Sequence, residues 1–152
     1  MFLALSFSIA KAQSTSSAAA EPLLHGKTYT IRIKQVSQGK KGTEYGKEEA
    51  EEFSFKAGKF KTLMFARDFQ MPVKPYEITN VDSATGTQTI YWECNIDWSE
   101  TDKVVFKGEI EGGNAIKGTV EWTVKNKPKK TLNYEFVGEL KEKKKKTPPT
   151  TK

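Results

Sequence analysis

Side-chain alternation over residues 87–98 constrains the fold of this chain more than any other feature of its sequence. Successive side chains of a β-strand point to opposite faces, so an alternating segment has one apolar and one polar face. A helix would not place both tryptophans and both isoleucines of this segment on one side. We therefore predict a long strand here. Its apolar set is Ile90, Trp92, Cys94, Ile96 and Trp98, and its opposite set is Tyr91, Glu93, Asn95 and Asp97.

The same period of two continues to residue 140 and is weaker before residue 87. The C-terminal part predicts strands at 104–111, 116–124 and 132–140, with Gly112-Gly113-Asn114 as a hairpin turn whose residues tolerate positive φ. The N-terminal part predicts strands at 27–36, around Phe53 and Phe55, at 59–65 and at 76–81, with a tight turn at Ala57-Gly58. No helical period competes with these patterns after residue 12.

These segments make about eight strands joined mostly by short connections. Short connections join antiparallel neighbours, because parallel pairing needs long crossovers. A sheet with one apolar face curls that face inward, and closure into a barrel removes the exposed edges. We predict an all-β fold, a single antiparallel up-and-down β-barrel, with a two-sheet β-sandwich as the alternative. A barrel of the outer-membrane type, with its apolar face outward, is disfavoured because the chain ends in lysines.

Two segments interrupt the strand pattern. Residues 37–48 are polar and contain three glycines, which predicts a long flexible loop. Residues 67–75 contain two prolines, which predicts a connection or a poor edge segment.

A motif of glycine between two apolar residues occurs at Phe106–Ile110, Ile116–Val120 and Phe136–Leu140. Each glycine takes an inward-facing position, where we expect strand curvature or a tryptophan lying over the backbone, or alternatively room for a guest. With the aromatic inner face, the size and the export signal described below, this pattern resembles small exported barrels of the lipocalin-like (calycin) type. The Gly-x-Trp signature of lipocalins proper has no counterpart at Gly26-Lys27-Thr28. The resemblance implies a barrel whose interior holds a small apolar molecule.

The chain divides into four segments. Residues 1–12 combine a short apolar run with Ala10-Lys11-Ala12, which predicts a signal peptide and an exported, periplasmic or secreted, protein. Residues 13–24 predict a flexible linker, residues 25–140 the barrel domain and residues 141–152 a disordered lysine-rich tail. The tail carries +5 of the net charge of +6, and residues 13–140 are neutral. Nucleic acid is therefore not an expected partner, whereas the tail could contact anionic surfaces. No segment predicts a transmembrane span, and the oligomeric state is left open.

Residues suited to catalysis are few. His25 is the single histidine and Cys94 the single cysteine, so a zinc site of four such ligands is ruled out. Cys94 lies on the apolar face, where we expect it to be buried and inert. The carboxylates of the strands, such as Glu93 and Glu109, fall on the polar face, where they predict cross-strand pairs with lysines such as Lys107 and Lys117. We expect no cofactor, no metal and no enzymatic activity.

The aromatic side chains of the predicted inner face are the remaining functional signal. They indicate either a core or a pocket for a small apolar ligand in or at the mouth of the barrel, since barrels of about eight strands are filled or hold one ligand. The alternative hypothesis is a structural or protein-interaction module with a filled core, which binds through the segments 37–48 and 67–75. The candidate ligand-binding residues are Trp92, Trp98, Phe106, Trp122, Tyr134 and Phe136.

Overall fold

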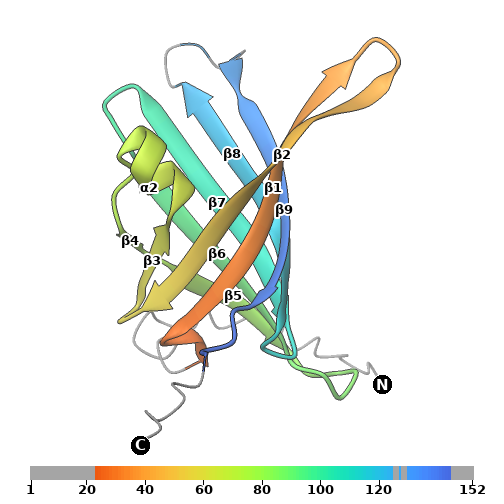
Figure 1. The fold of residues 1–152 in the computed structure, drawn as a ribbon, viewed down its shortest axis with the longest axis vertical. Helices are drawn as coiled ribbons and strands as arrows, with labels where there is room; N and C mark the ends of the chain where they lie inside the picture. Colours follow the sequence, from red (N-terminus) through yellow and green to blue (C-terminus); the bar gives the residue numbers. More distant parts are fainter. Residues whose placement is uncertain (1–22, 125–126, 128–129, 145–152) are drawn as a thin grey trace, which may run out of the picture.

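The fold was taken from a computed structural model, which describes residues 23–124, 127 and 130–144. The segment 1–12, most of the linker 13–24 and residues 145–152 of the tail lie outside these residues. Nine antiparallel strands and a short helix, α2, follow one another along the chain (Figure 1). The strands are β1 (Lys27–Gly39), β2 (Gly42–Lys56), β3 (Lys59–Thr62), β4 (Lys74–Pro75), β5 (Glu77–Asp82), β6 (Thr89–Asp97), β7 (Asp102–Glu111), β8 (Ala115–Val124) and β9 (Leu132–Leu140), and α2 (Met64–Phe69) lies between β3 and β4.

The strands form one sheet in the order β4-β3-β2-β1-β9-β8-β7-β6-β5. The first and last strands of the chain are therefore paired, and the sheet curls into a nearly closed barrel (Figure 1). The seam lies between β4 and β5, and β4 approaches β6 across it, with the Cys94 thiol 3.3 Å from the Pro75 carbonyl oxygen. Proline lacks the N–H that would extend the ladder at this point. The prediction of an all-β antiparallel barrel is confirmed, with nine strands in place of about eight, and the sandwich alternative is wrong.

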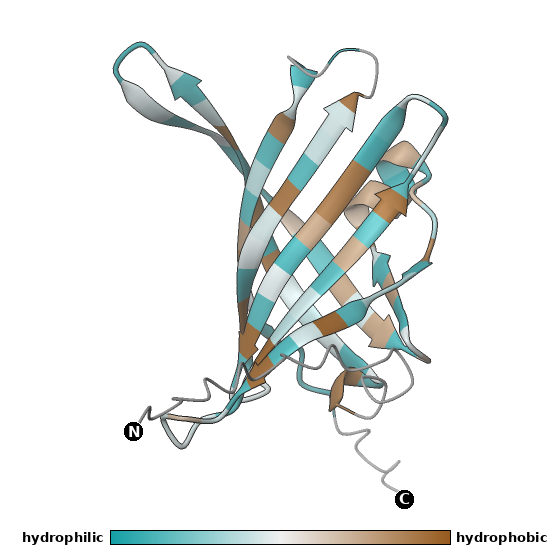
Figure 2. Cartoon of the chain, turned by 180° about the vertical axis from the view of Figure 1, so that it is seen from behind, coloured by the Kyte–Doolittle hydropathy of each residue, from teal (hydrophilic) through white to brown (hydrophobic). Residues whose placement is uncertain are grey.

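The alternation of the sequence is reproduced in the burial of the side chains. In β6, Ile90, Trp92, Cys94 and Ile96 are each at most 2% exposed. In β1, Tyr29, Ile31 and Ile33 face the same core. Figure 2 shows apolar and polar bands alternating along β6, β7 and β8. The apolar face points inward, the reverse of the arrangement in an outer-membrane barrel. The core also includes Leu24, the last residue of the range assigned to the linker.

The prediction of a flexible loop at residues 37–48 is wrong. These residues continue β1 and β2 as a two-stranded ribbon, with Ser37 opposite Glu44 and Gly39 opposite Gly42. We call residues 37–48 the arm; it extends from the end of the barrel near α2 (Figure 1). Residues 40–50 are all exposed. Because both faces of the arm meet solvent, its sequence has no apolar alternation, and the period of two that marks the other strands is missing.

The predicted strand at 59–65 is too long. β3 ends at Thr62, and the chain turns into α2, whose six residues are too few to show a helical period in the sequence. Within residues 67–75 the structure combines the end of α2, a connection and the two-residue edge strand β4, in agreement with the expectation of a poor edge segment.

Charged side chains on the outer face of β6, β7 and β8 form the expected cross-strand pairs. Glu93 lies opposite Lys107, and their charged atoms are 3.7 Å apart. Glu109 lies opposite Lys117 at 2.9 Å. The lysines of these pairs are largely exposed, so each pair contributes little to stability.

No helix in the part of the chain that the structure describes has the length and apolar character needed to cross a membrane.

Candidate functional site

The six candidate residues divide between two regions of the barrel. Trp92, Phe106 and Phe136 lie in its middle and are at most 1% exposed. Trp98, Trp122 and Tyr134 lie at the end of the barrel near α2, where Trp98 and Tyr134 are only partly buried. The sequence therefore grouped into one site residues that the structure separates into an interior set and an end set.

Aromatic rings fill the middle of the barrel. The Phe53 ring lies 5.0 Å from the rings of Phe60 and Phe136, measured between centroids. It lies 5.7 Å from Phe106 and 6.5 Å from Trp92, with all four rings steeply inclined to it. These are edge-to-face contacts, in which rings meet without a gap between them. Side chains from β2, β3, β6, β7 and β9 thus occupy the space that a ligand inside the barrel would need.

Two of the three glycines of the repeated motif serve this ring packing, whereas the space at Gly138 is taken by Thr30 and Ile31. Trp92, Gly108, Gly118 and Phe136 form one row across β6, β7, β8 and β9. A Cβ atom on Gly108 would lie 2.8 Å from Nε1 of Trp92, and one on Gly118 would lie 2.6 Å from Cζ of Phe136. Such distances are too short for a side chain. The space above both glycines is therefore taken by Trp92 and Phe136, as the packing interpretation expects, and not by a guest.

Helix α2 covers the neighbouring end of the barrel. Its Phe65 side chain is fully buried, with ring centroids 5.7 Å from Phe106, 5.8 Å from Tyr134 and 6.3 Å from Trp122. The ring thus connects the interior set of aromatic residues with the end set. Because the ring occupies the mouth, α2 acts as a plug at this end.

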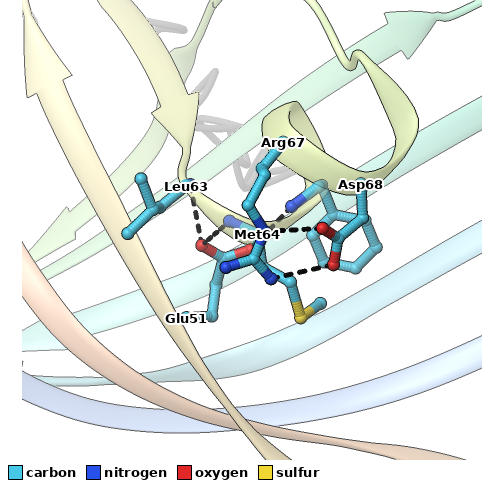
Figure 3. A network of polar contacts seen from close by, with 6 residues as sticks. Glu51, Leu63, Met64, Arg67 and Asp68 are labelled. Atoms are coloured by element: carbon cyan, nitrogen blue, oxygen red, sulfur yellow. Dashed lines mark hydrogen bonds and ion pairs between the residues drawn. The ribbon is translucent and has the colours of Figure 1, made fainter.

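A buried carboxylate holds α2 in place. Glu51 of β2 is 4% exposed, and its Oε1 accepts hydrogen bonds from the backbone N–H groups of Leu63 at 2.7 Å and Met64 at 2.8 Å (Figure 3). Its Oε2 accepts a third bond from the N–H of Phe65 at 3.2 Å. The first N–H groups of a helix have no partner within the helix. A carboxylate accepts their hydrogen bonds, and its negative charge interacts favourably with the positive end of the helix dipole.

Glu51 was missed at the sequence level, although a signal was present. It shares the parity of Phe53 and Phe55, so the alternation places an acidic side chain on the apolar face of β2. A charge on that face needs partners, because burial of an unpaired carboxylate is costly. The partners come from the backbone of α2, a helix that the sequence pattern does not reveal.

Apolar side chains stay exposed around Trp122. The Phe69 ring lies 5.1 Å from the Trp122 ring, and the Trp98 ring lies 5.3 Å from the Trp122 ring. Leu132 is the cross-strand partner of Trp122. Phe69 and Leu132 are each 39% exposed, and the Trp122 indole donates a hydrogen bond to Asp102 at 3.1 Å. We call this surface the aromatic rim; it consists of Phe69, Trp98, Trp122 and Leu132.

Tyr134 also lines a small polar hollow between the base of the arm and the barrel. The hollow has a volume of about 230 Å³ and includes Gln35, Gly46, Lys47 and Glu49. Burial raises the pKa of the Tyr134 hydroxyl, and the negative charge of Glu49 raises it further. The hydroxyl therefore stays protonated at neutral pH and is a hydrogen-bonding group, not a base.

The single cysteine, Cys94, and the single histidine, His25, have separate surroundings in the structure. Burial raises the pKa of the Cys94 thiol to about 12, so the nucleophilic thiolate is disfavoured. Nδ1 of His25 accepts a hydrogen bond from the backbone N–H of Ala57 at 3.1 Å, at the turn between β2 and β3. Among residues 23–124, 127 and 130–144, no three His, Cys, Asp or Glu side chains are grouped so that they could hold a metal ion.

The chain matched none of the protein-family models in a scan, and a search of curated proteins found no significant match. The class is therefore defined by the fold alone: a nearly closed antiparallel β-barrel, compatible with the lipocalin-like resemblance, with an aromatic interior and a helix over one end.

Proposed function

We propose that this protein is a non-enzymatic interaction module that binds an apolar segment of a partner protein at the aromatic rim. The observation that carries the proposal is the exposure of Phe69, whose ring contacts Trp122, and of Leu132, the cross-strand partner of Trp122. Exposed apolar side chains that cluster at one place are typical of interaction sites, whereas scattered ones need no explanation. Tryptophan and other aromatic residues are also the common anchors of protein interfaces.

The filled interior favours this hypothesis over a small apolar ligand inside the barrel. A lipocalin-like binding protein needs an inner cavity, and the contacts of Phe53 with four rings leave its centre occupied. Phe65 of α2 blocks the mouth in addition. The likeness to lipocalin-like proteins would therefore lie in the architecture alone, and binding would occur at the rim, not in the interior.

The arm stands at the same end of the barrel as α2 and could enlarge the contact (Figure 1). Tyr45 is 55% exposed, and the ammonium group of Lys34 lies 4.1 Å from the centre of its ring. This cation–π contact stabilises the exposed position of the Tyr45 ring on the arm. Of the two segments of the interaction hypothesis, 37–48 thus lies at this end as a ribbon, and 67–75 contributes Phe69 there. The rest of 67–75 leads away into β4, where Pro75 lies opposite Lys59.

Export remains part of the proposal. It rests on the apolar run and small-x-small pattern of residues 1–12. An exported interaction module would find its partner outside the cytoplasm, in a periplasm or beyond the cell.

A photo-crosslinking comparison tests the proposal. A benzophenone side chain is placed at position 69 on the rim and, as a control of similar exposure, at Val137, which is 44% exposed on the outer face of β9. In the native extracellular or periplasmic fraction, we expect a discrete crosslinked partner from position 69, lost when Leu132→Glu is added. Equal crosslinking from both positions would contradict the proposal. A saturable quenching of tryptophan fluorescence by fatty acids would instead support the ligand hypothesis.

A further inference from the structure

Three lysines lie on the outer face of β2 and β3, namely Lys56, Lys59 and Lys61. They are close to the turn between these strands, which is at the end of the barrel away from α2 (Figure 1). Strand register brings them together. Lys56 lies directly opposite Lys59, and Lys61 lies opposite Ser54, which in turn lies opposite Thr28. These side chains share the outer face because the alternate positions, Phe55 and Phe60, are in the core.

A hollow of about 440 Å³ opens between these side chains. The Thr28 and Ser54 hydroxyls are 3.3 Å apart on its floor, and Val73 lines one wall. We call this hollow the lysine groove and define it by Thr28, Ser54, Lys56, Lys59 and Lys61.

The three ammonium groups are not neutralised. Within residues 23–124, 127 and 130–144, none of Lys56, Lys59 and Lys61 forms an ion pair. The neighbouring carboxylate on this face, Glu52, is already paired with Lys141 at 2.6 Å. The backbone N–H of Lys141 bonds to the Thr28 carbonyl oxygen, so the lysine-rich segment 141–144 begins beside the groove and adds to its positive potential.

The direct opposition of Lys56 and Lys59 destabilises the fold, because like charges at paired strand positions repel. The turn between them, with φ of 51° at Ala57 and 69° at Gly58, is a tight one that keeps the two positions close. A local feature that opposes stability is typical of a functional site.

We propose that the lysine groove binds a small phosphorylated molecule. Lysine ammonium groups and hydroxyls are the donors that bind phosphate oxygens, and three cations match the charge of a phosphomonoester or diphosphate. The volume lies in the range of small-molecule sites, about 300–1,000 Å³. A concave site of this size suits a compact ligand better than a flat membrane surface. The lysine groove is separate from the aromatic rim, so an experiment can disprove one of the two proposals without affecting the other.

Calorimetric titration of the full chain with inorganic pyrophosphate at low ionic strength tests the proposal. We expect saturable one-to-one binding that weakens about tenfold or more in K56Q/K61Q, through loss of two charge-assisted contacts. The matched control is K107Q/K117Q, which removes the same charge from the ion-paired outer face of β7 and β8 and should change the affinity less than about twofold.

A second variant separates binding from folding. K59E places opposite charges across the hairpin from Lys56, so we expect a higher unfolding temperature together with binding at least about tenfold weaker. The absence of saturable pyrophosphate binding by the wild-type chain, or an equal loss in both double variants, would overturn the proposal. Binding to phosphatidylglycerol vesicles without saturable pyrophosphate binding would also overturn it, because it would make the face a membrane surface.

Discussion

The middle of the barrel and its α2 end use the same aromatic residue types in different ways. In the middle, Phe53 meets Trp92 and Phe136 edge to face. Trp92 and Phe136 lie over the backbones of Gly108 and Gly118, and all three rings are shielded from solvent. At the α2 end, Phe69 and Trp98 contact Trp122, and Phe69 stays 39% exposed. The difference teaches that an aromatic inner face does not by itself indicate a ligand pocket. Its function depends on whether neighbouring strands leave the rings any open space.

Phe53→Ala should give the largest effect, because Phe53 contacts four other rings in the middle of the barrel. Removal of a fully buried phenylalanine costs about 3–5 kcal/mol of unfolding free energy. Urea unfolding followed by circular dichroism measures this loss. A loss below about 1 kcal/mol would mean that the middle of the barrel is loosely packed, and the contrast between the middle and the α2 end would not hold.

Glu51→Ala should cost about 3 kcal/mol, since it leaves buried N–H groups at the start of α2 without their acceptor. Hydrogen exchange at Met64 and Phe65 should accelerate more than in the rest of the barrel, whereas the Leu63 N–H keeps the Glu52 carbonyl oxygen as an acceptor. The control is Glu49→Ala on the same face of β2, where the side chain is exposed and the cost should stay within about 0.5 kcal/mol. Equal effects of the two substitutions would show that the carboxylate does not hold the plug.

Alkaline pH should destabilise the barrel through Cys94. Its thiol pKa is raised by burial from 9.0 to about 12, so the folded state retains a proton that the unfolded state loses. This contribution to stability is complete below pH 9 and is lost as the pH rises toward 12, with a slope of at most about 1.4 kcal/mol per pH unit. Unfolding curves of wild type and Cys94→Ala between pH 9 and 11 measure the difference in slope. Parallel curves would contradict a shielded thiol.

Phe69→Ala should have the smallest effect on stability, about 0.5 kcal/mol or less, because the ring is partly exposed and outside the core. Its effect should appear in binding to the partner found by crosslinking. A loss of stability similar to that of Phe53→Ala would mean that the rim is simply a continuation of the core.

Lysine-rich hollows on the outer face show a second contrast. On β6 to β9, Lys107 and Lys117 line a hollow of about 530 Å³ but are paired with Glu93 and Glu109. On β2 and β3, Lys56, Lys59 and Lys61 form no such pairs among the residues described. The net charge of the chain cannot distinguish these faces; only strand register decides which lysine meets a carboxylate.

Strand parity explains why much of the barrel could be predicted from the sequence. From Ile90 onward each strand has one buried and one solvent-exposed face, so the period of two is clear in the residues themselves. The arm has two exposed faces and α2 has fewer than two turns, so neither leaves a periodic signal. The separation of Trp98 and Trp122 from Trp92 depends on distance along the barrel axis and on the plug formed by Phe65. Alternation predicts on which face of the sheet a side chain lies, but not how far along the barrel axis it lies.

The central claim is that the middle of the barrel is filled and that binding occurs at its end. A crystal structure of the protein under xenon pressure tests it most directly, because xenon enters apolar cavities that rings leave empty. We expect no xenon among the rings of Phe53, Trp92 and Phe106, and any bound atom should lie at the aromatic rim. A xenon site enclosed by those three rings would contradict the account and restore the hypothesis of an internal ligand.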